Sequence, residues 1–190
     1  MKLKKDINIA KDSNALIAGL LIGLGVIINV QTNPAILGAL LFSFGLLTII
    51  QLKLPLYTGR IGFLAPRLVF ILLWNLIGVG FITILYFCSN PDFYNLLLEA
   101  SINKFDKPCL HFLIGGIFCG ILIHFAVKCK VSYLTSMAVI IFILIGAEHC
   151  IADFPYLLIN FSFINSMKII LVIIGNSIGA IFIERMVTNE

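Results

Sequence analysis

The chain has 190 residues, of which 61% are hydrophobic and only 12% charged, and its net charge is +4. Soluble domains are about half apolar and about a quarter charged, so this composition excludes a water-soluble enzyme and a disordered chain. The apolar residues extend through nearly the whole length, and a membrane span needs about 20 of them. We therefore expect a single integral membrane domain over residues 1–190, with about six spans in the lipid bilayer.

Six apolar stretches along the chain predict six membrane-spanning helices. The second runs into Pro55 and Gly59, which interrupt a helix because proline lacks a backbone donor and glycine permits a turn. The fifth is too long for one span and carries Glu148 and His149 near its middle, which predicts a second interruption. The segment between the third and fourth, residues 90–108, is predicted to be the main outer loop. The six stretches are residues 15–30, 35–52, 68–87, 110–127, 133–163 and 167–186.

The distribution of lysine and arginine predicts the orientation, because cytoplasmic loops carry an excess of both. With the N-terminus inside, nine of them lie on the cytoplasmic side and three on the outside. We therefore expect both termini in the cytoplasm, in a prokaryotic inner membrane. The nine are Lys2, Lys4, Lys5, Lys11, Arg60, Arg67, Lys128, Lys130 and Arg185, and the three are Lys104, Lys107 and Lys168.

The two interruptions fall in the second helix of each of two three-helix units. These units start on opposite sides of the membrane, so they form an inverted repeat. Paired interrupted helices at matching positions indicate a site near the midplane, and irregular backbone at that depth is tolerated only where it is buried or lines a cavity. The sequence thus predicts a pathway between the two breaks.

The residues best suited to chemistry lie in segment 146–153. Ionisable side chains inside a span are costly and by default functional. His149 can donate a hydrogen bond and exchange a proton near neutral pH, which suits a weak acid that must lose its charge to cross apolar walls. Glu148 is expected to hold the imidazole in place. The alternative is that Glu148 and His149 only satisfy backbone groups freed by the break.

Other polar residues have weaker signals. Thr58 offers a hydroxyl at the first break, and Asn75 and Asn176 are candidates for hydrogen bonds to the interrupted backbone. Lys53 and Arg60 either draw anions to a cytoplasmic mouth or extend to the interface, as long basic side chains do. Four other residues have simpler interpretations: Gly175 and Gly179 predict close helix packing, and His111 and His124 are expected at the membrane interface.

Several classes of function lack their sequence signatures. There is no Gly-x-Ser-x-Gly, no P-loop and no dinucleotide fingerprint. The five cysteines show no zinc-type spacing. The small net charge is too scattered for a nucleic-acid surface. We therefore expect no enzymatic activity, no cofactor, no metal and no nucleic-acid partner.

Four segments, in order along the chain, resemble the motifs of the formate/nitrite transporter family. The clearest is Gly-Ala-Glu-His-Cys-Ile-Ala-Asp at 146–153, which is similar to that family's fifth-helix motif Gly-Phe-Glu-His-Ser-Ile-Ala-Asn. Asp153 thus stands where the family has asparagine, and the connection after Thr58 is shorter than usual. The other three are Leu-Phe-Ser-Phe-Gly-Leu at 41–46 with Leu-Tyr-Thr-Gly at 56–59, Asn-Leu-Ile-Gly at 75–78, and Gly-Asn-Ser-Ile-Gly at 175–179.

The resemblance implies an aquaporin-like fold and a homopentamer with one pore in each subunit. Members of the family pass small weak-acid anions such as formate, nitrite and hydrosulfide. By position, His149 matches the central pore histidine and Thr58 the threonine of the broken second helix. Phe42 and Phe142 match an aromatic narrowing, and an apolar narrowing is matched by Leu46, Leu56, Tyr57 and Ile123.

Three functions remain open at this point. The first is a channel or proton-coupled facilitator for a weak-acid anion. The second is a pore for a small neutral solute such as water or urea, which needs no proton exchange. The third is a membrane subunit that transports nothing, which the shortened connection after Thr58 favours.

Overall fold

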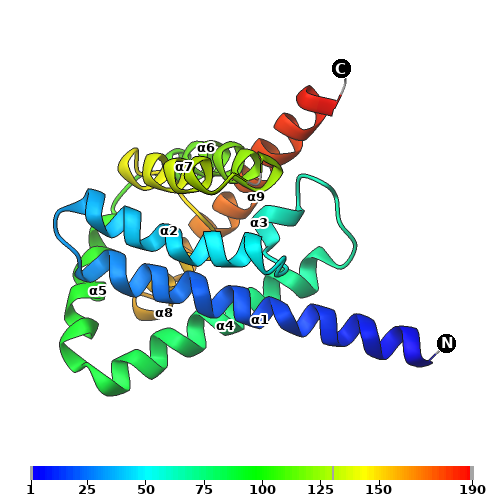
Figure 1. Ribbon diagram of the computed structural model, residues 1–190. Coiled ribbons are helices and arrows are strands. Elements are labelled where there is room, and N and C mark those ends of the chain that lie inside the picture. The colour runs from blue at the N-terminus through cyan, green and yellow to red at the C-terminus, as the bar shows by residue number, and fades with distance from the viewer. Residues whose placement is uncertain (1, 130, 189–190) are drawn as a thin grey trace.

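The computed structural model describes the backbone of residues 2–129 and 131–188, and the side chains within 14–129 and 131–188. This part of the chain is all α-helical (Figure 1). The side chains of Lys2, Lys4, Lys5 and Lys11, and residue Lys130, lie outside it. The helices are α1 (Lys2–Gln31), α2 (Ala35–Gln51), α3 (Tyr57–Arg60), α4 (Leu68–Ser89), α5 (Pro91–Phe105), α6 (Cys109–Cys129), α7 (Ser132–Leu144), α8 (Phe154–Ile159) and α9 (Phe163–Thr188).

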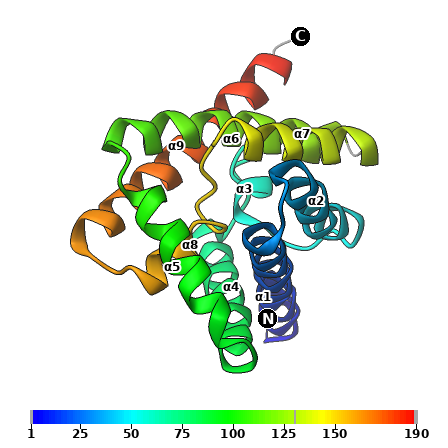
Figure 2. The same cartoon turned by 90° about the vertical axis from the view of Figure 1, so that its left-hand side faces the viewer.

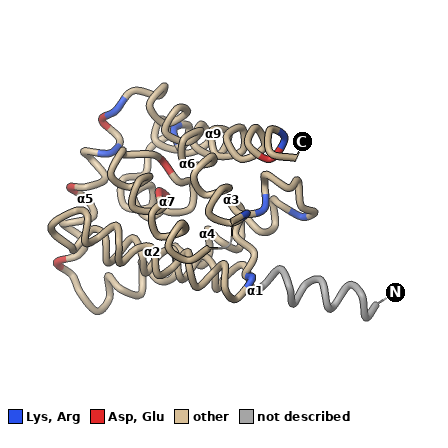
Figure 3. Tube along the Cα trace, turned by 45° about the horizontal axis from the view of Figure 1, so that its top comes forward, with Lys and Arg blue, Asp and Glu red and all other residues tan. Residues whose placement is uncertain are grey.

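Four of the described helices contain stretches long and apolar enough to cross a membrane: Asn14–Gln31, Leu68–Ser89, Cys109–Cys129 and Phe163–Thr188. The shorter apolar helices α2 and α7 correspond to the two spans that were predicted to be interrupted. The six predicted stretches are therefore all present, and the chain is an integral membrane protein. Most charged positions lie toward the two ends of the bundle (Figure 3).

The predicted connection between the third and fourth spans is not an irregular loop, because most of it forms helix α5. Pro91 occupies the first turn, where its missing N–H is not needed. Phe93, Leu97, Ser101 and Phe105 recur every four residues and are all buried, so they form one inward face of a helix. The mixed composition of this segment made the amphipathic pattern hard to recognise in the sequence. Because the buried face turns inward, the neighbouring Lys104 lies against the rest of the protein.

The remaining long helices form two groups of three. Helix α1 packs along α4 and against α2, while α6 packs along α9 and against α7. Figure 2 shows the two groups as separate halves, which meet where α2 packs against α7. Both termini lie at the same end of the molecule, together with α3, and α5 lies at the opposite end (Figure 1).

The two helix breaks have the same backbone structure. After α2, the N–H of Lys53 bonds to the carbonyl of Ile50, and the N–H of Leu54 bonds to that of Ile49. After α7, Gly146 bonds to Ile143 and Ala147 to Phe142 in the same pattern. Both are Schellman endings, which need one residue in the left-handed region. Lys53 has a φ of 55° and Gly146 a φ of 67°, so the two breaks are equivalent turns.

Helices α6 and α9 approach so closely that only glycine fits between them. A Cβ atom added to Gly175 would lie 2.9 Å from both the Cα of Gly116 and the backbone N of Ile117, and it would also meet the carbonyl of Leu113. These are backbone atoms that cannot rotate away. The small residues at 175 and 179 therefore serve the packing role expected of them.

We expect Gly175→Ala to destabilise the protein. Forcing the helices apart costs about 1–3 kcal/mol, which outweighs the gain of up to about 1 kcal/mol in helix propensity. The matched control is Gly80→Ala, where the added Cβ would meet only the side chain of Leu158 at 3.3 Å and that of Phe154 at 3.5 Å. Thermal unfolding in detergent should show a lower midpoint for Gly175→Ala alone. Equal midpoints would contradict this account of the helix contact.

Candidate functional site

The two broken helices meet through one hydrogen bond between buried side chains. The hydroxyl oxygen of Thr58, in α3, lies 2.9 Å from Nε2 of His149, in the second break. The other ring nitrogen, Nδ1, accepts the backbone N–H of Ala152 at 3.1 Å. Because Nδ1 acts as an acceptor, the neutral ring carries its proton on Nε2 and donates it to Thr58. The hydroxyl proton of Thr58 is then left to donate to a third group.

Two buried asparagines hold the breaks in place with matching sets of hydrogen bonds. Asn75, in α4, accepts the N–H of Tyr57 at 2.9 Å and donates to the carbonyls of Pro55 at 3.0 Å and Ala15 at 2.7 Å. The backbone groups of Tyr57, Pro55 and Ala15 are thereby satisfied, as buried polar groups must be.

Asn176, in α9, does the same in the other half. It accepts the N–H of Cys150 at 3.0 Å and donates to the carbonyls of Glu148 and Gly116, both at 2.9 Å. In each half, the asparagine bonds to two residues of the break that are two positions apart in sequence. Its third partner lies in the first helix of the same three-helix group. Asn75 and Asn176 thus bond to the two breaks in the same way, and this register makes His149 equivalent to Leu56.

A cavity of about 190 Å³ lies on the α5 side of the Thr58–His149 pair, and we call it the α5-side cavity. Phe42 and Phe142 line it with their rings 5.9 Å apart and nearly perpendicular, at 82°. The ring of Phe142 lies 6.2 Å from that of His149. The structure thus brings together the two aromatic residues and His149. The charged lining residues are Lys104, Lys107, Glu148 and Asp153.

A second cavity, of about 400 Å³, lies on the α3 side, and we call it the α3-side cavity. Three basic residues line it: Lys53, Arg60 and Lys128. Its apolar lining includes Leu56, the residue equivalent to His149, and Ile49 from α2. Lys128 is paired with Glu184 at 2.9 Å, so Lys53 and Arg60 are the cations that make this mouth attractive to anions.

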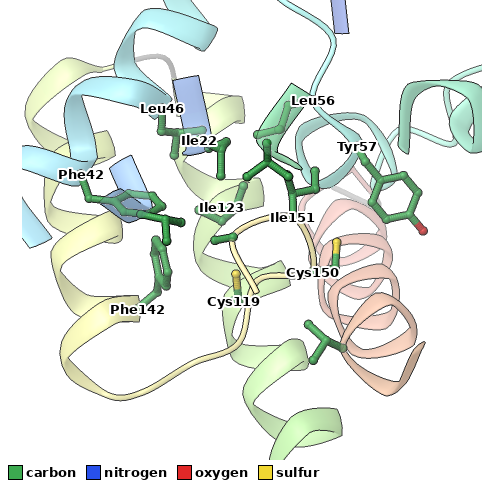
Figure 4. Packing of buried hydrophobic residues seen from close by; sticks show 14 of the residues in the cluster. Ile22, Phe42, Leu46, Leu56, Tyr57, Cys119, Ile123, Phe142, Cys150 and Ile151 are labelled. Atoms are coloured by element: carbon green, nitrogen blue, oxygen red, sulfur yellow. The ribbon is translucent and has the colours of Figure 1, made fainter. Parts of the chain in front are cut away.

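An apolar barrier separates the two cavities. Along one face of α2, Phe42 lines the α5-side cavity, Leu46 is buried one turn later, and Ile49 lines the α3-side cavity. Seven residues of helix correspond to about 10 Å. Figure 4 shows Leu46, Leu56 and Ile123 close to Ile22 in this region, and all are almost fully buried. Three of the four residues expected at the apolar narrowing therefore lie together.

Tyr57, the fourth, lies elsewhere. Its ring points away from this group toward α9 (Figure 4), where its hydroxyl is 2.9 Å from that of Ser177. It lines an apolar groove along α9 with Ile173 and Phe182. Neighbouring residues at a helix start project in different directions, so Leu56 and Tyr57 do not share a wall.

The carboxylate of Glu148 does not hold the imidazole of His149, contrary to expectation. The two residues are consecutive in a non-helical segment, and extended backbone sends successive side chains to opposite sides. Glu148 instead bonds to Lys104 of α5 and, at 3.0 Å, to Nε2 of His111 of α6. Lys104 also lies 2.9 Å from the carboxylate of Asp153. We call these four residues the acidic cluster.

Little in the sequence predicted the acidic cluster. Lys104 lies in the segment predicted to be a loop, and His111 was expected at the interface without a partner. His124, also expected there, is fully buried and bonds to Glu184 at 2.8 Å. Among the described residues, no group of three or more His, Cys, Asp or Glu side chains is placed to hold a metal ion.

No protein-family profile matches the chain, and no curated protein matches it in sequence. Solved structures do match. A protein described as a pentameric formate channel with formate bound superposes with a TM-score of 0.79 over 96% of both chains, at 18% identity. The chain has the fold of the formate/nitrite channels. A second example, an FNT family ion channel, gives a TM-score of 0.81 at 17% identity, covering 97% of this chain and 91% of its own. The expected aquaporin-like fold of two broken-helix repeats is confirmed.

Proposed function

We propose that the chain forms a transmembrane pathway for small monovalent weak-acid anions, of which formate, nitrite and hydrosulfide are the candidates. The observation that carries the proposal is the Thr58–His149 hydrogen bond, which joins the two breaks between two cavities that both carry basic residues. The formate/nitrite channel fold supports it, because one similar structure is described as a channel with formate bound.

The pair would stabilise an anion without carrying a charge itself. His149 donates to the oxygen of Thr58, which polarises the hydroxyl and strengthens its own donation to an anion. Hydrogen bonds to charged groups contribute about 1.5–3 kcal/mol. The apolar barrier beside the pair disfavours a bare anion, so a weak acid that crosses part of the way as its neutral form fits best.

The test is uptake of formate, nitrite and hydrosulfide by proteoliposomes, with protein-free liposomes as the control for diffusion of the neutral acid through lipid. Protein-dependent flux of at least one of the three is the expected result. Well-folded, correctly assembled protein that passes none of them would contradict the proposal and favour a subunit that transports nothing.

We expect Thr58→Val to lower anion flux by about ten-fold. Valine keeps the shape of threonine and removes the hydroxyl, and a hydrogen bond to a charged group contributes at least about 1.5 kcal/mol. Thr48→Val is the matched control, because Thr48 lines neither cavity and its hydroxyl bonds to the carbonyl of Phe44. Unchanged flux in Thr58→Val would mean that the hydroxyl does not contact the anion.

The assembly and orientation are part of the same proposal. A homopentamer with both termini in the cytoplasm fits the pentameric relative and the placement of both termini at one end of the bundle. The α3-side cavity then opens to the cytoplasm and the α5-side cavity to the outside. Native mass spectrometry should give five copies, and reporters fused to either terminus should be active only inside the cell.

A pore for a small neutral solute is the second candidate, and the neutral tautomer of His149 favours it. A neutral donor pair beside the buried Leu46 and Ile123 suits an uncharged hydrogen-bonding solute as well as an anion. The two functions differ in their response to pH. Flux of water or urea that does not depend on pH, with no anion flux, would select the neutral-solute pore.

A further inference from the structure

The acidic cluster contains one carboxylate oxygen that nothing satisfies. Asp153 is buried, with 3% of its surface exposed. Its Oδ1 lies 2.9 Å from the ammonium group of Lys104. Its Oδ2 is one of two buried side-chain N or O atoms in the described part of the chain that lack a hydrogen-bond partner. A buried carboxylate oxygen without a donor is costly, and a proton on it removes much of that cost.

The charges around Asp153 do not require it to be ionised. Lys104 forms ion pairs with both Glu148 and Asp153, and two carboxylates that share one cation repel each other. Glu148 has a second partner in His111, whereas no donor in the described part of the chain reaches the Oδ2 atom of Asp153. Tyr156 places its ring 5.2 Å from the ammonium group of Lys104 and adds no positive charge. From α9, Lys168 donates to the carbonyl of Phe105 instead.

Asp153 also faces the pathway. It lines the α5-side cavity, which His149 lines as well, four residues earlier in the chain. The lining holds two lysines, Lys104 and Lys107, against two carboxylates, so its charges balance. A proton on Asp153 leaves the lining with one net positive charge. Binding of a proton and binding of an anion in this cavity therefore favour each other.

We propose that Asp153 is the proton-binding residue of the α5-side cavity and the proton donor to the entering weak-acid anion. This inference rests on the proposed function. His149 is poorly placed for that role, because its Nδ1 is already occupied by the N–H of Ala152 and cannot accept a replacement proton. In the proposed step, the O–H bond of the Asp153 carboxyl breaks and the proton joins the anion, which becomes the neutral acid.

The step balances within the cavity. The negative charge passes from the anion to Asp153, whose carboxylate remains paired with Lys104. The neutral acid then meets the apolar barrier without the cost of a bare charge. A proton from the water outside restores the carboxyl, so one proton crosses with each anion.

The experiment compares the unmodified protein with Asp153→Asn, which keeps the shape and removes the titratable group. Formate uptake by proteoliposomes is measured from about pH 7 to about pH 5, with protein-free liposomes subtracted. We expect uptake to rise several-fold toward low pH in the unmodified protein and to stay flat in Asp153→Asn. Asp106→Asn, an exposed carboxyl at the end of α5, is the matched control and should keep the rise.

Infrared spectroscopy of the purified protein supplies a readout that needs no transport. The carbonyl stretch of a neutral carboxyl group should be present in the unmodified protein, absent in Asp153→Asn and unchanged in Asp106→Asn. Titrating the unmodified protein alone keeps the test valid if Asp153→Asn does not fold.

The outcomes separate the two proposals. The carboxyl band without any anion flux would retain the proton site and reject the proposed function. Anion flux whose rise with acidity persists in Asp153→Asn would retain the function and overturn the role of Asp153. The absence of the band from the unmodified protein would overturn it too, as would an acid response that disappears in His111→Gln, since the proton would then reside on His111.

Discussion

His149→Phe is expected to reduce anion flux by about ten- to hundred-fold. Phenylalanine keeps the approximate volume of the ring and removes both nitrogens. Thr58 then loses the donor that polarises it, and the anion meets an apolar ring at the junction of the two breaks. The loss of hydrogen bonding to a charged group, about 1.5–3 kcal/mol, corresponds to this fall in rate. Formate uptake by proteoliposomes measures the effect.

Folding has to be separated from transport in this variant, because phenylalanine also leaves the N–H of Ala152 without an acceptor. His149→Asn is the matched variant, since its side-chain oxygen can replace Nδ1 and keep that bond. We expect His149→Asn to unfold at nearly the same temperature as the unmodified protein and to lose flux nonetheless. If both variants conduct normally, His149 only supports the backbone of the break.

The helix breaks were predictable because their causes are local. Pro55 and Gly146 interrupt a helix whatever surrounds them, and an ionisable residue such as His149 in an apolar stretch stands out at once. The inverted repeat followed from the matching positions of the two breaks. Asn75 and Asn176 were also recognisable, because an amide inside a span needs partners and interrupted backbone offers them.

The parts that could not be predicted depend on long-range pairing. Lys104 reaches Glu148 only because α5 folds inward, and the amphipathic face that directs it is short and mixed in composition. The direction in which each side chain of the breaks points could not be predicted from the sequence either. Glu148 and His149 are neighbours in sequence, but their side chains contact different groups. Likewise, Leu56 lies in the apolar barrier, whereas the neighbouring Tyr57 points away from it and contacts Ser177.

Asn176→Asp is expected to prevent correct folding. In the native protein the amide nitrogen of Asn176 donates to the carbonyls of Gly116 and Glu148. A carboxylate would place a buried negative oxygen against two acceptors, which loses both bonds and adds repulsion. An uncompensated buried charge typically costs about 3–5 kcal/mol, a large part of the total stability of about 5–15 kcal/mol. Size-exclusion chromatography in detergent should show aggregate.

Asn95→Asp is the matched control, because Asn95 is exposed on α5 and the same charge there should be tolerated. Asn75→Asp provides the sharper comparison. Its amide makes the corresponding bonds in the other half, to Ala15 and Pro55, so the same failure is expected if the two halves are equivalent. Lowering the pH should help both variants only in part, since a neutral carboxyl supplies one donor where the amide supplies two. If Asn176→Asp elutes and unfolds like the unmodified protein, the second break is held by other contacts and the equivalence of the two asparagines is only geometric.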